Sequence, residues 1–512
     1  MLSGIFGKKS SHPMADIKSA QALLSDLPKN DAYKSLMELS EWIESVADNS
    51  DFKPDHQFAV LRLLDETAQP FARKLAREYF TTQELNKFQE NRLWLVLENL
   101  YRHTARAYYA VFDRYCGGDK GAAAIKAQLP LLAARAICAM TGQLKYACAR
   151  YGPIHNTIWE NLAHLYQHAE QQQYLDIPVA LYAGAAGSVT VKDELARMLG
   201  WYGCGVGSLK PLYIHLTERI VGQYCASINV GTQRSESALF CFDLEHPAAP
   251  TLVKVHDDVQ PSMRFIGTAE LQPKLAALIN ATEKGIVPEE VNLGGSYDAE
   301  PVREAAQYLL NYLTAPPSRR STRRGIKVGM KVVNGFDKMI ERTEIALNFS
   351  ESQPAHWNVE DISASGFRTV LPAQGTDGIC IGSLLCVQPD GVPHWGAAVV
   401  RRLMRDDANR LHVGAEMLTS QIADVALSQS GGGGGGFEDG QPALWLLAKP
   451  GELSGEARLL MKAGAFSAHR SLQTRLAGKK YLLIPGKLQE KGLDYDLANF
   501  RAIEQESDQG GA

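Results

Sequence analysis

The sequence predicts a multidomain α+β protein with a helical N-terminal half and a β-rich C-terminal half. Its 512 residues, 45% of them hydrophobic, are enough for three or four domains with their own cores. Apolar residues recur at a spacing of three to four as far as about residue 230. Beyond about residue 325 the pattern changes to short apolar or alternating runs, separated by proline, glycine and aspartate. Helices are therefore expected first, and antiparallel strands after them.

Residues 15–232 are predicted to form an α-helical bundle or a helical-repeat region, after a disordered N-terminus at residues 1–14. Apolar positions fall on one helical face between residues 15 and 50. The same spacing continues through residues 57–79, 82–112 and 121–150. Ile154–Gln173 resembles one helix of a tetratricopeptide-type pair, but no fixed period identifies a repeat family.

Three features of this half are interpreted as structural. The glycine-rich segment Gly200–Ser208 matches no phosphate-binding loop and is predicted to connect two helices. His164 and His168 lie four residues apart without a third metal ligand, which is typical of a solvated or partly packed pair. Eight cysteines without a paired Cys-x-x-Cys spacing favour buried thiols over zinc or disulfides. The sequence contains no nucleophile elbow, metal-ligand set or phosphate loop. We therefore expect that the protein is not an enzyme and binds no metal or cofactor.

Residues 233–315 are predicted to be a small α/β connector. Two strand-like runs, residues 238–244 and 251–255, are separated by prolines, and two helices are expected at residues 271–284 and 300–313.

The β-rich half begins with a predicted antiparallel barrel or sandwich at residues 316–428. Its expected strands include residues 367–371, 383–387, 395–401 and 411–418. A glycine-rich linker or loop is expected at residues 429–440. The last β segment, residues 441–504, is either an extension that closes the preceding barrel or a second small β-module. The tail at residues 505–512 is expected to be disordered.

Four arginines lie within six residues at the start of this half: Arg319, Arg320, Arg323 and Arg324. Between residues 316 and 331 there are six basic side chains and no acidic one, in a chain whose net charge is −4. Such a block calls for an anionic partner. The guanidinium fork makes paired hydrogen bonds to phosphate oxygens, and it also fits the O6/N7 edge of guanine.

About forty residues later comes the hexapeptide Asp361–Gly366, whose side chains complement the arginines. The Asp361 carboxylate accepts hydrogen bonds, and the ring-NH and amino edge of guanine donates them. Ser363 both donates and accepts. Gly366 allows a positive φ, or a closer approach to a ring system than a Cβ permits. Together the two motifs predict a pocket for an anionic guanine nucleotide.

The pair of motifs, Arg-x-x-x-Arg followed by Asp-x-Ser-x-x-Gly, resembles the PilZ family of cyclic di-GMP receptors over residues 318–427. The resemblance implies a six-stranded antiparallel barrel and a mobile arginine arm that wraps the ligand. Two registers fit the first motif, Arg319 with Arg323 or Arg320 with Arg324. We favour the second, because Arg324 lies closer to the apolar alternation that would begin the first strand. In either register the arginines would hold phosphate and the guanine Hoogsteen edge.

By the same resemblance, Asp361, Ser363 and Gly366 would contact the other base region. The interval between the motifs is long, so residues 335–357 are expected to hold an elaborated hairpin with turns at Asn334–Gly335 and Asn348–Gln353.

The function predicted is a cyclic di-GMP receptor whose barrel signals to a helical region that binds a protein partner, in a process such as motility or biofilm formation. Ligand binding would order the arm and shift the connector and bundle against the barrel. The alternative is a nucleotide-independent scaffold with a degenerate barrel. The acidic overall charge disfavours nucleic acid as the partner. No long apolar run suggests a membrane span or secretory signal, so we expect a cytoplasmic protein.

Overall fold

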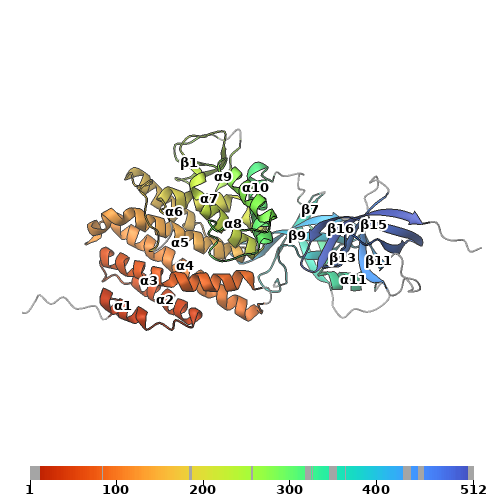
Figure 1. Ribbon diagram of the computed structural model, residues 1–512, viewed down its shortest axis with the longest axis horizontal. Helices are drawn as coiled ribbons and strands as arrows, with labels where there is room; N and C mark the ends of the chain where they lie inside the picture. The colour runs from red at the N-terminus through yellow and green to blue at the C-terminus, as the bar shows by residue number, and fades with distance from the viewer. Residues whose placement is uncertain are drawn as a thin grey trace, which may run out of the picture. The chain divides into compact units, whose positions relative to one another are not determined.

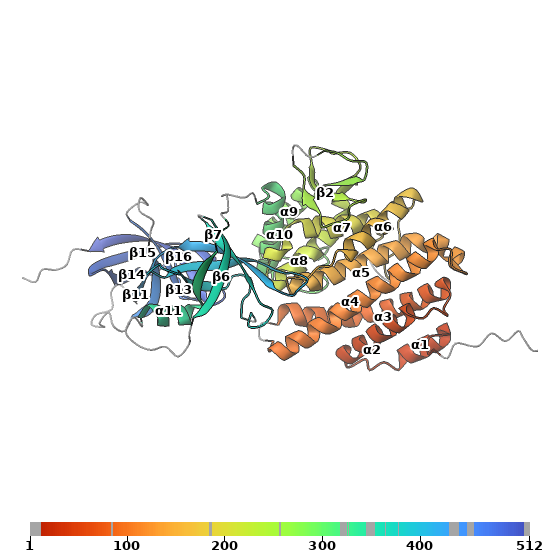
Figure 2. The same cartoon turned by 180° about the vertical axis from the view of Figure 1, so that it is seen from behind.

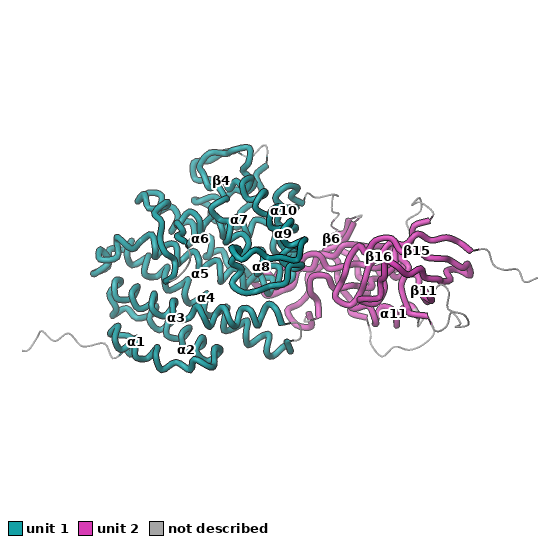
Figure 3. The backbone as a smooth tube through the Cα atoms, viewed as in Figure 1, with its two compact units in different colours: residues 1–317 teal, residues 318–512 magenta. Residues whose placement is uncertain are grey.

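A computed structural model describes residues 12–82, 85–183, 187–254, 258–317, 325, 327–344, 354–363, 365–376, 378–429, 440–447 and 455–505 (Figures 1 and 2). The chain divides into two compact units, Met1–Pro317 and Ser318–Ala512 (Figure 3). Most of the predicted N-terminal segment, glycine-rich linker and C-terminal tail lies outside the described residues. The fold is α+β and multidomain, as predicted.

Unit 1 begins with helices that lie side by side in chain order, α2 and α3 against α4, and α4 against α5, in both views (Figures 1 and 2). The helices are α1 (Ile17–Ser25), α2 (Ala32–Ala47), α3 (Pro54–Thr81), α4 (Lys87–Cys116), α5 (Leu129–Ala149), α6 (Thr157–Gln171), α7 (Val191–Gly203) and α8 (Pro211–Gln223). Their lengths range from 9 to 30 residues, so the described helices form a bundle and not a regular repeat.

Local sequence signals start several of these helices. The Asp31 side chain caps α2 by accepting the Lys34 N–H at 3.0 Å. Asn86 and Gln89 form a reciprocal capping box at the start of α4. Proline stands in the first turn of α3, α5 and α8, where its missing N–H breaks no hydrogen bond.

The core of unit 1 is built around α5. Ala122–Ala149, a stretch that includes α5, is long and apolar enough to cross a membrane by length and composition, the one such stretch among the described residues. However, 61% of its apolar window is buried inside the unit. Arg135 and Lys145 on α5 are also buried, and each is paired with a carboxylate, Glu66 and Glu218 respectively. Burial among neighbouring helices therefore accounts for the apolar character of α5.

The rest of unit 1 contains strands and helices where the connector was predicted, together with two strands that were not predicted, β1 and β4. The glycine-rich segment begins inside the end of α7 and continues toward α8, with Gly205 at a φ of +68°, so it connects two helices as predicted. A four-stranded sheet follows in the order β1-β4-β2-β3, with helices α9 and α10. Their bounds are β1 (Asn229–Gly231), β2 (Ala238–Asp243), β3 (Thr251–Leu252), β4 (Met263–Gly267), α9 (Leu271–Glu283) and α10 (Ala299–Thr314).

Unit 2 contains two closed six-stranded antiparallel barrels. The first barrel has the strand order β10-β7-β6-β5-β8-β9, and it confirms the predicted six-stranded barrel. Its strands are β5 (Val328–Asn334), β6 (Ala355–Ser363), β7 (Gly366–Leu371), β8 (Leu384–Pro389), β9 (Gly396–Arg405) and β10 (Leu411–Thr419). Each of the four strands expected between residues 367 and 418 is present.

A helix, α11 (Phe336–Glu344), stands between β5 and β6, where a turn was expected at Asn334–Gly335. Gly335 does adopt a φ of +102°, but the chain then enters the helix. The Phe336 N–H donates to the Asp494 carboxylate at 2.6 Å, so a residue 158 positions away caps the helix. The two-residue turn is therefore corrected to a helix start. The second expected turn, Asn348–Gln353, lies outside the described residues.

The second barrel has the strand order β11-β12-β13-β16-β15-β14, so the last β segment forms a module and does not close the first barrel. It includes β11, which belongs to the range 316–428 that was assigned to the first β-domain. The barrel therefore begins before the glycine-rich segment. Its strands are β11 (Ile422–Gln429), β12 (Gln441–Leu446), β13 (Glu456–Lys462), β14 (Leu472–Leu476), β15 (Lys479–Lys491) and β16 (Tyr495–Gln505).

One hydrophobic cluster joins α11 to both barrels. It contains Phe336, Met339 and Ile340 of α11, with residues of β8 and β9 on one side and of β12, β13 and β16 on the other. Strands in this region are buried on both faces: in β12, Leu444 and Leu446 face the shared cluster while their neighbours fill the second barrel. Two-sided burial explains why these strands have continuous apolar runs and not an alternating pattern.

A charged contact also links the barrels. Arg401 of β9 donates to both carboxylate oxygens of Glu490 on β15, at 2.7 and 2.6 Å. Its Nε donates to Glu416 of β10 at 2.8 Å. The Tyr495 hydroxyl donates to Glu490 at 2.8 Å. The paired geometry fixes the orientation of both side chains.

We expect the Arg401→Met and Glu490→Gln substitutions to show a coupling energy of about 1 kcal/mol in a double-mutant cycle, because the bridge is bidentate but Arg401 is partly exposed. Chemical denaturation of the four proteins measures this energy. The Lys479–Glu504 pair is a matched control, since both side chains are more than half exposed. Its cycle should give about 0.3 kcal/mol. Equal coupling in both cycles would contradict a joining role for Arg401.

Candidate ligand-binding site

The predicted Asp-x-Ser-x-x-Gly motif forms the connection between β6 and β7 of the first barrel. Asp361 and Ser363 occupy the last residues of β6, and Gly366 is the first residue of β7. Ser363 pairs with Gly366, and Asp361 pairs with Arg368, after an irregularity in the register at Glu360. The Ser363 hydroxyl donates to the Gly366 carbonyl at 3.1 Å. The structure thus brings all three residues to one tight connection.

Gly366 is required by the close approach of another strand. A Cβ built on Gly366 would lie 2.2 Å from the carbonyl oxygen of Ala415 on β10. A positive φ and a close approach to a ring were the two reasons expected for this glycine. Its φ is not positive. The close approach is observed, but to the backbone of β10 and not to a ring. The motif therefore also fixes where β10 lies against β7.

Arg319, Arg320, Arg323 and Arg324 lie outside the described residues, so their meeting with Asp361 stays a prediction. Chain connectivity nevertheless limits where they can be. β5 begins at Val328, four residues after Arg324, and Val328 pairs with Val359 of β6. Four residues span at most about 14 Å. The chain therefore enters the first barrel through β5, the strand next to the one that bears Asp361.

Sequence reasoning missed a charged chain beside this connection. Arg368 of β7 donates to Nδ1 of His412 on β10 at 2.9 Å, and Nε2 of His412 lies 3.0 Å from the Asp406 carboxylate. The hydrogen bond from His412, with others from Arg410, holds the pKa of Asp406 well below its ordinary value. When the Nε2–H of His412 donates to Asp406, Nδ1 is left to accept from Arg368. Alternation of outward residues in β7 and β10 was the signal that could have found them.

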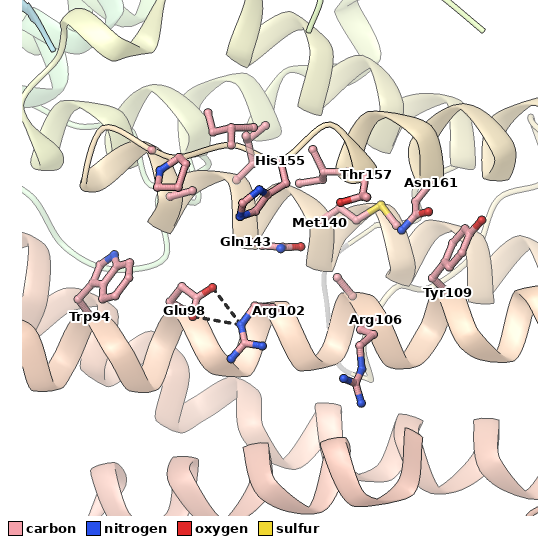
Figure 4. A pocket seen from close by; sticks show the side chains of 17 residues that line it. Trp94, Glu98, Arg102, Arg106, Tyr109, Met140, Gln143, His155, Thr157 and Asn161 are labelled. Atoms are coloured by element: carbon pink, nitrogen blue, oxygen red, sulfur yellow. Dashed lines mark hydrogen bonds and ion pairs between the residues drawn. The ribbon is translucent and has the colours of Figure 1, made fainter. Parts of the chain in front are cut away.

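Unit 1 has a pocket of about 420 Å³ between α4, α5 and the start of α6 (Figure 4). Trp94, Glu98, Arg102 and Arg106 reach it from α4, and His155 faces them from the opposite wall (Figure 4). Both arginines already have carboxylate partners, because Arg102 lies 3.2 Å from Glu98 and Arg106 pairs with Asp48. The pocket is therefore not preorganised for an anion.

The histidine pair on α6 is engaged by tyrosines. Nδ1 of His164 lies 2.9 Å from the Tyr109 hydroxyl, and Nδ1 of His168 lies 2.9 Å from the Tyr174 hydroxyl. Burial lowers the pKa of His168, and the nearby His164 lowers it further. Within the described part of the chain, no group of three potential metal ligands converges. All eight cysteines are described, and none forms a disulfide.

Residues 18–234 match the family model described as the N-terminal domain of the cyclic-di-GMP receptor FimW. The match runs from α1 to just beyond β1 and covers less than half of the chain. The family it names is a receptor family and not an enzyme class. The first barrel lies outside the matched residues, so its resemblance to PilZ proteins stays a prediction. No curated protein matches the chain.

Proposed function

We propose that the protein is a cyclic di-GMP receptor in which the first barrel binds the dinucleotide. In this proposal the arginine segment, residues 319–324, grips the phosphates and one guanine edge, and Asp361 accepts hydrogen bonds from the donor edge of a guanine. Ser363 and Gly366 shape the connection that presents Asp361.

The observation that supports the proposal is the pairing of β5, the first described strand after the arginine segment, with β6, the strand that bears Asp361. Val328 pairs with Val359, so the chain that leaves Arg324 enters the barrel next to the strand that bears Asp361. In the proposal the two motifs, whose chemistry is complementary for a guanine nucleotide, meet at this edge of the barrel. The match of unit 1 to a receptor's N-terminal domain supports the same ligand class.

We further propose that binding is passed to unit 1, whose helices bind a protein partner. The arginine segment directly follows Pro316–Pro317 at the end of unit 1, so it is also the link between the units. A ligand that orders this link necessarily changes the freedom of unit 1 relative to unit 2.

Binding of labelled cyclic di-GMP to the full chain tests the proposal. We expect Arg320→Ala/Arg324→Ala to weaken binding about a hundredfold or more, because each charge-assisted hydrogen bond contributes about 1.5–3 kcal/mol. The affinity of Arg319→Ala/Arg323→Ala for the dinucleotide distinguishes the two registers, because the pair that contacts the ligand should show the larger loss. Asp361→Ala should weaken binding about tenfold or more, whereas Asp361→Asn, which keeps an acceptor oxygen, should retain part of the affinity.

Arg470→Ala/Arg501→Ala serves as the control for lost positive charge, because both residues belong to the second barrel region and are exposed. Wild-type protein that fails to bind at micromolar ligand would favour the nucleotide-independent scaffold. Normal binding by all barrel variants would instead move the search for the dinucleotide site to unit 1 and its pocket.

A further inference from the structure

A single row of residues crosses the outer face of the first barrel from Asp361. In the strand register, Asp361 of β6 pairs with Arg368 of β7, Arg368 pairs with Gly414 of β10, and Gly414 pairs with Arg402 of β9. Directly paired residues project from the same face of a sheet. We call these four residues the outer row.

Burial shows that three of these residues, Arg368, Gly414 and Arg402, face outward. In β7 and β10 the residues on either side of Arg368 and of Gly414 are buried, while these two are not. Arg402 is exposed and its neighbour Leu403 is buried. The row spans three strand spacings, about 14 Å. Arg368, Gly414 and Arg402 therefore form an accessible strip beside Asp361, whose Oδ1 is buried while the residue as a whole is partly exposed.

Gly414 leaves a gap in the strip between the two arginines. A Cβ there would meet the Arg402 Cβ at 3.4 Å, which is ordinary contact, and no positive φ requires glycine. Neither backbone geometry nor crowding explains the absence of a side chain at this position. A ligand that approaches the backbone of β10 between two guanidinium groups would explain it.

The two arginines differ in how they are held. Arg368 is tied by its hydrogen bond to His412, which fixes the plane of its guanidinium. Arg402 has no ion pair or hydrogen bond among the described residues. A fixed planar cation suits stacking on a purine, and an uncommitted one is available to an anion.

We propose that the outer row extends the dinucleotide site: a guanine whose edge meets Asp361 stacks on Arg368, and the phosphodiester crosses Gly414 to pair with Arg402. This inference rests on the proposed function and adds Arg368, Gly414 and Arg402 to it. The added contacts all come from described residues on the neighbouring strands β7, β10 and β9.

Titration of the full chain with labelled cyclic di-GMP tests this extension through Arg402→Ala and Gly414→Val. We expect each to weaken binding about tenfold, the first by removing a charge-assisted pair and the second by filling the gap. Arg402→Lys should retain part of the affinity. The loss in Arg402→Ala should shrink as salt is raised, because screening already weakens the pair in the wild type. Arg470→Ala should bind as the wild type does.

Thermal unfolding of each variant separates lost binding from lost folding. If Gly414→Val unfolds at a lower temperature, the binding of Arg402→Ala alone tests the proposal, since an exposed arginine with no partner among the described residues contributes little to stability. Normal binding by Arg402→Ala, beside lost binding by Asp361→Ala, would overturn the outer row and leave the proposed function standing. Absence of binding by the wild type would overturn both.

Discussion

Gly366→Ala is expected to destabilise the first barrel by about 3 kcal/mol, although it adds only one methyl group. The added Cβ would lie 2.2 Å from the Ala415 carbonyl oxygen and 3.3 Å from the Glu416 Cα. Both contacts are to the backbone of β10, which is paired on both edges and cannot move away cheaply. The strand pair β7–β10 should therefore separate or shift.

Calorimetry of the full chain and hydrogen–deuterium exchange of peptides from β7 and β10 measure this effect. Exchange in these two strands should rise before exchange in β13 and β16 of the second barrel. Gly414→Ala is the matched control, because its Cβ makes only ordinary contact with Arg402 and should leave unfolding within about 0.5 kcal/mol of wild type. Identical unfolding of Gly366→Ala and Gly414→Ala would contradict the close approach of β10.

Hydrophobic periodicity predicted these strands well, because the burial of a strand is reflected in its own pattern of apolar and polar residues. The run predicted at 367–371 differs from β7 by one residue at its start. The runs at 383–387 and 395–401 were also found, since two-sided burial gives them continuous apolar sequences. The elements that pack against a strand could not be predicted in this way. In β12, for example, no local pattern indicates that one face meets α11.

Long-range contacts account for what the sequence did not reveal. Asn334–Gly335 has the composition of a hairpin turn, and the choice of a helix depends on Asp494, which caps α11 from the second barrel. The candidate site divides in the same way. Asp361, Ser363 and Gly366 form a local motif that can be read directly, whereas Arg368, Gly414 and Arg402 become neighbours only through strand register.

Glu218→Gln is expected to lower the free energy of unfolding of unit 1 by about 3–5 kcal/mol, because it removes one partner of a buried ion cluster. Glu218 on α8 accepts from Lys145 at 3.0 Å and from Arg197 at 2.9 Å, and its side chain is 1% exposed. Arg197 also pairs with the buried Glu194 at 3.2 Å. Two cations and two carboxylates thus balance, and the substitution leaves a buried excess of positive charge.

Urea denaturation followed by the helical circular-dichroism signal at neutral pH measures the loss. Glu90→Gln is the control, since Glu90 makes a partly exposed pair with Arg150 at 3.7 Å and should change stability by about 0.5 kcal/mol or less. Adding Lys145→Met to Glu218→Gln removes the excess cation and should recover part of the stability. Additive effects of these two substitutions would contradict a balanced cluster.

The stability that Glu218 contributes should also depend on pH. Burial alone would raise the pKa of Glu218, but the charges of Arg197 and Lys145 outweigh it and hold that pKa well below the ordinary value of 4.5. A carboxylate with a lowered folded-state pKa contributes stability that is present above its unfolded pKa and lost as pH falls below it. Below about pH 4.5 the wild type should therefore lose stability more steeply than Glu218→Gln, and the two proteins should converge. Parallel pH profiles for the two proteins would show that Glu218 is not held ionised in the folded state.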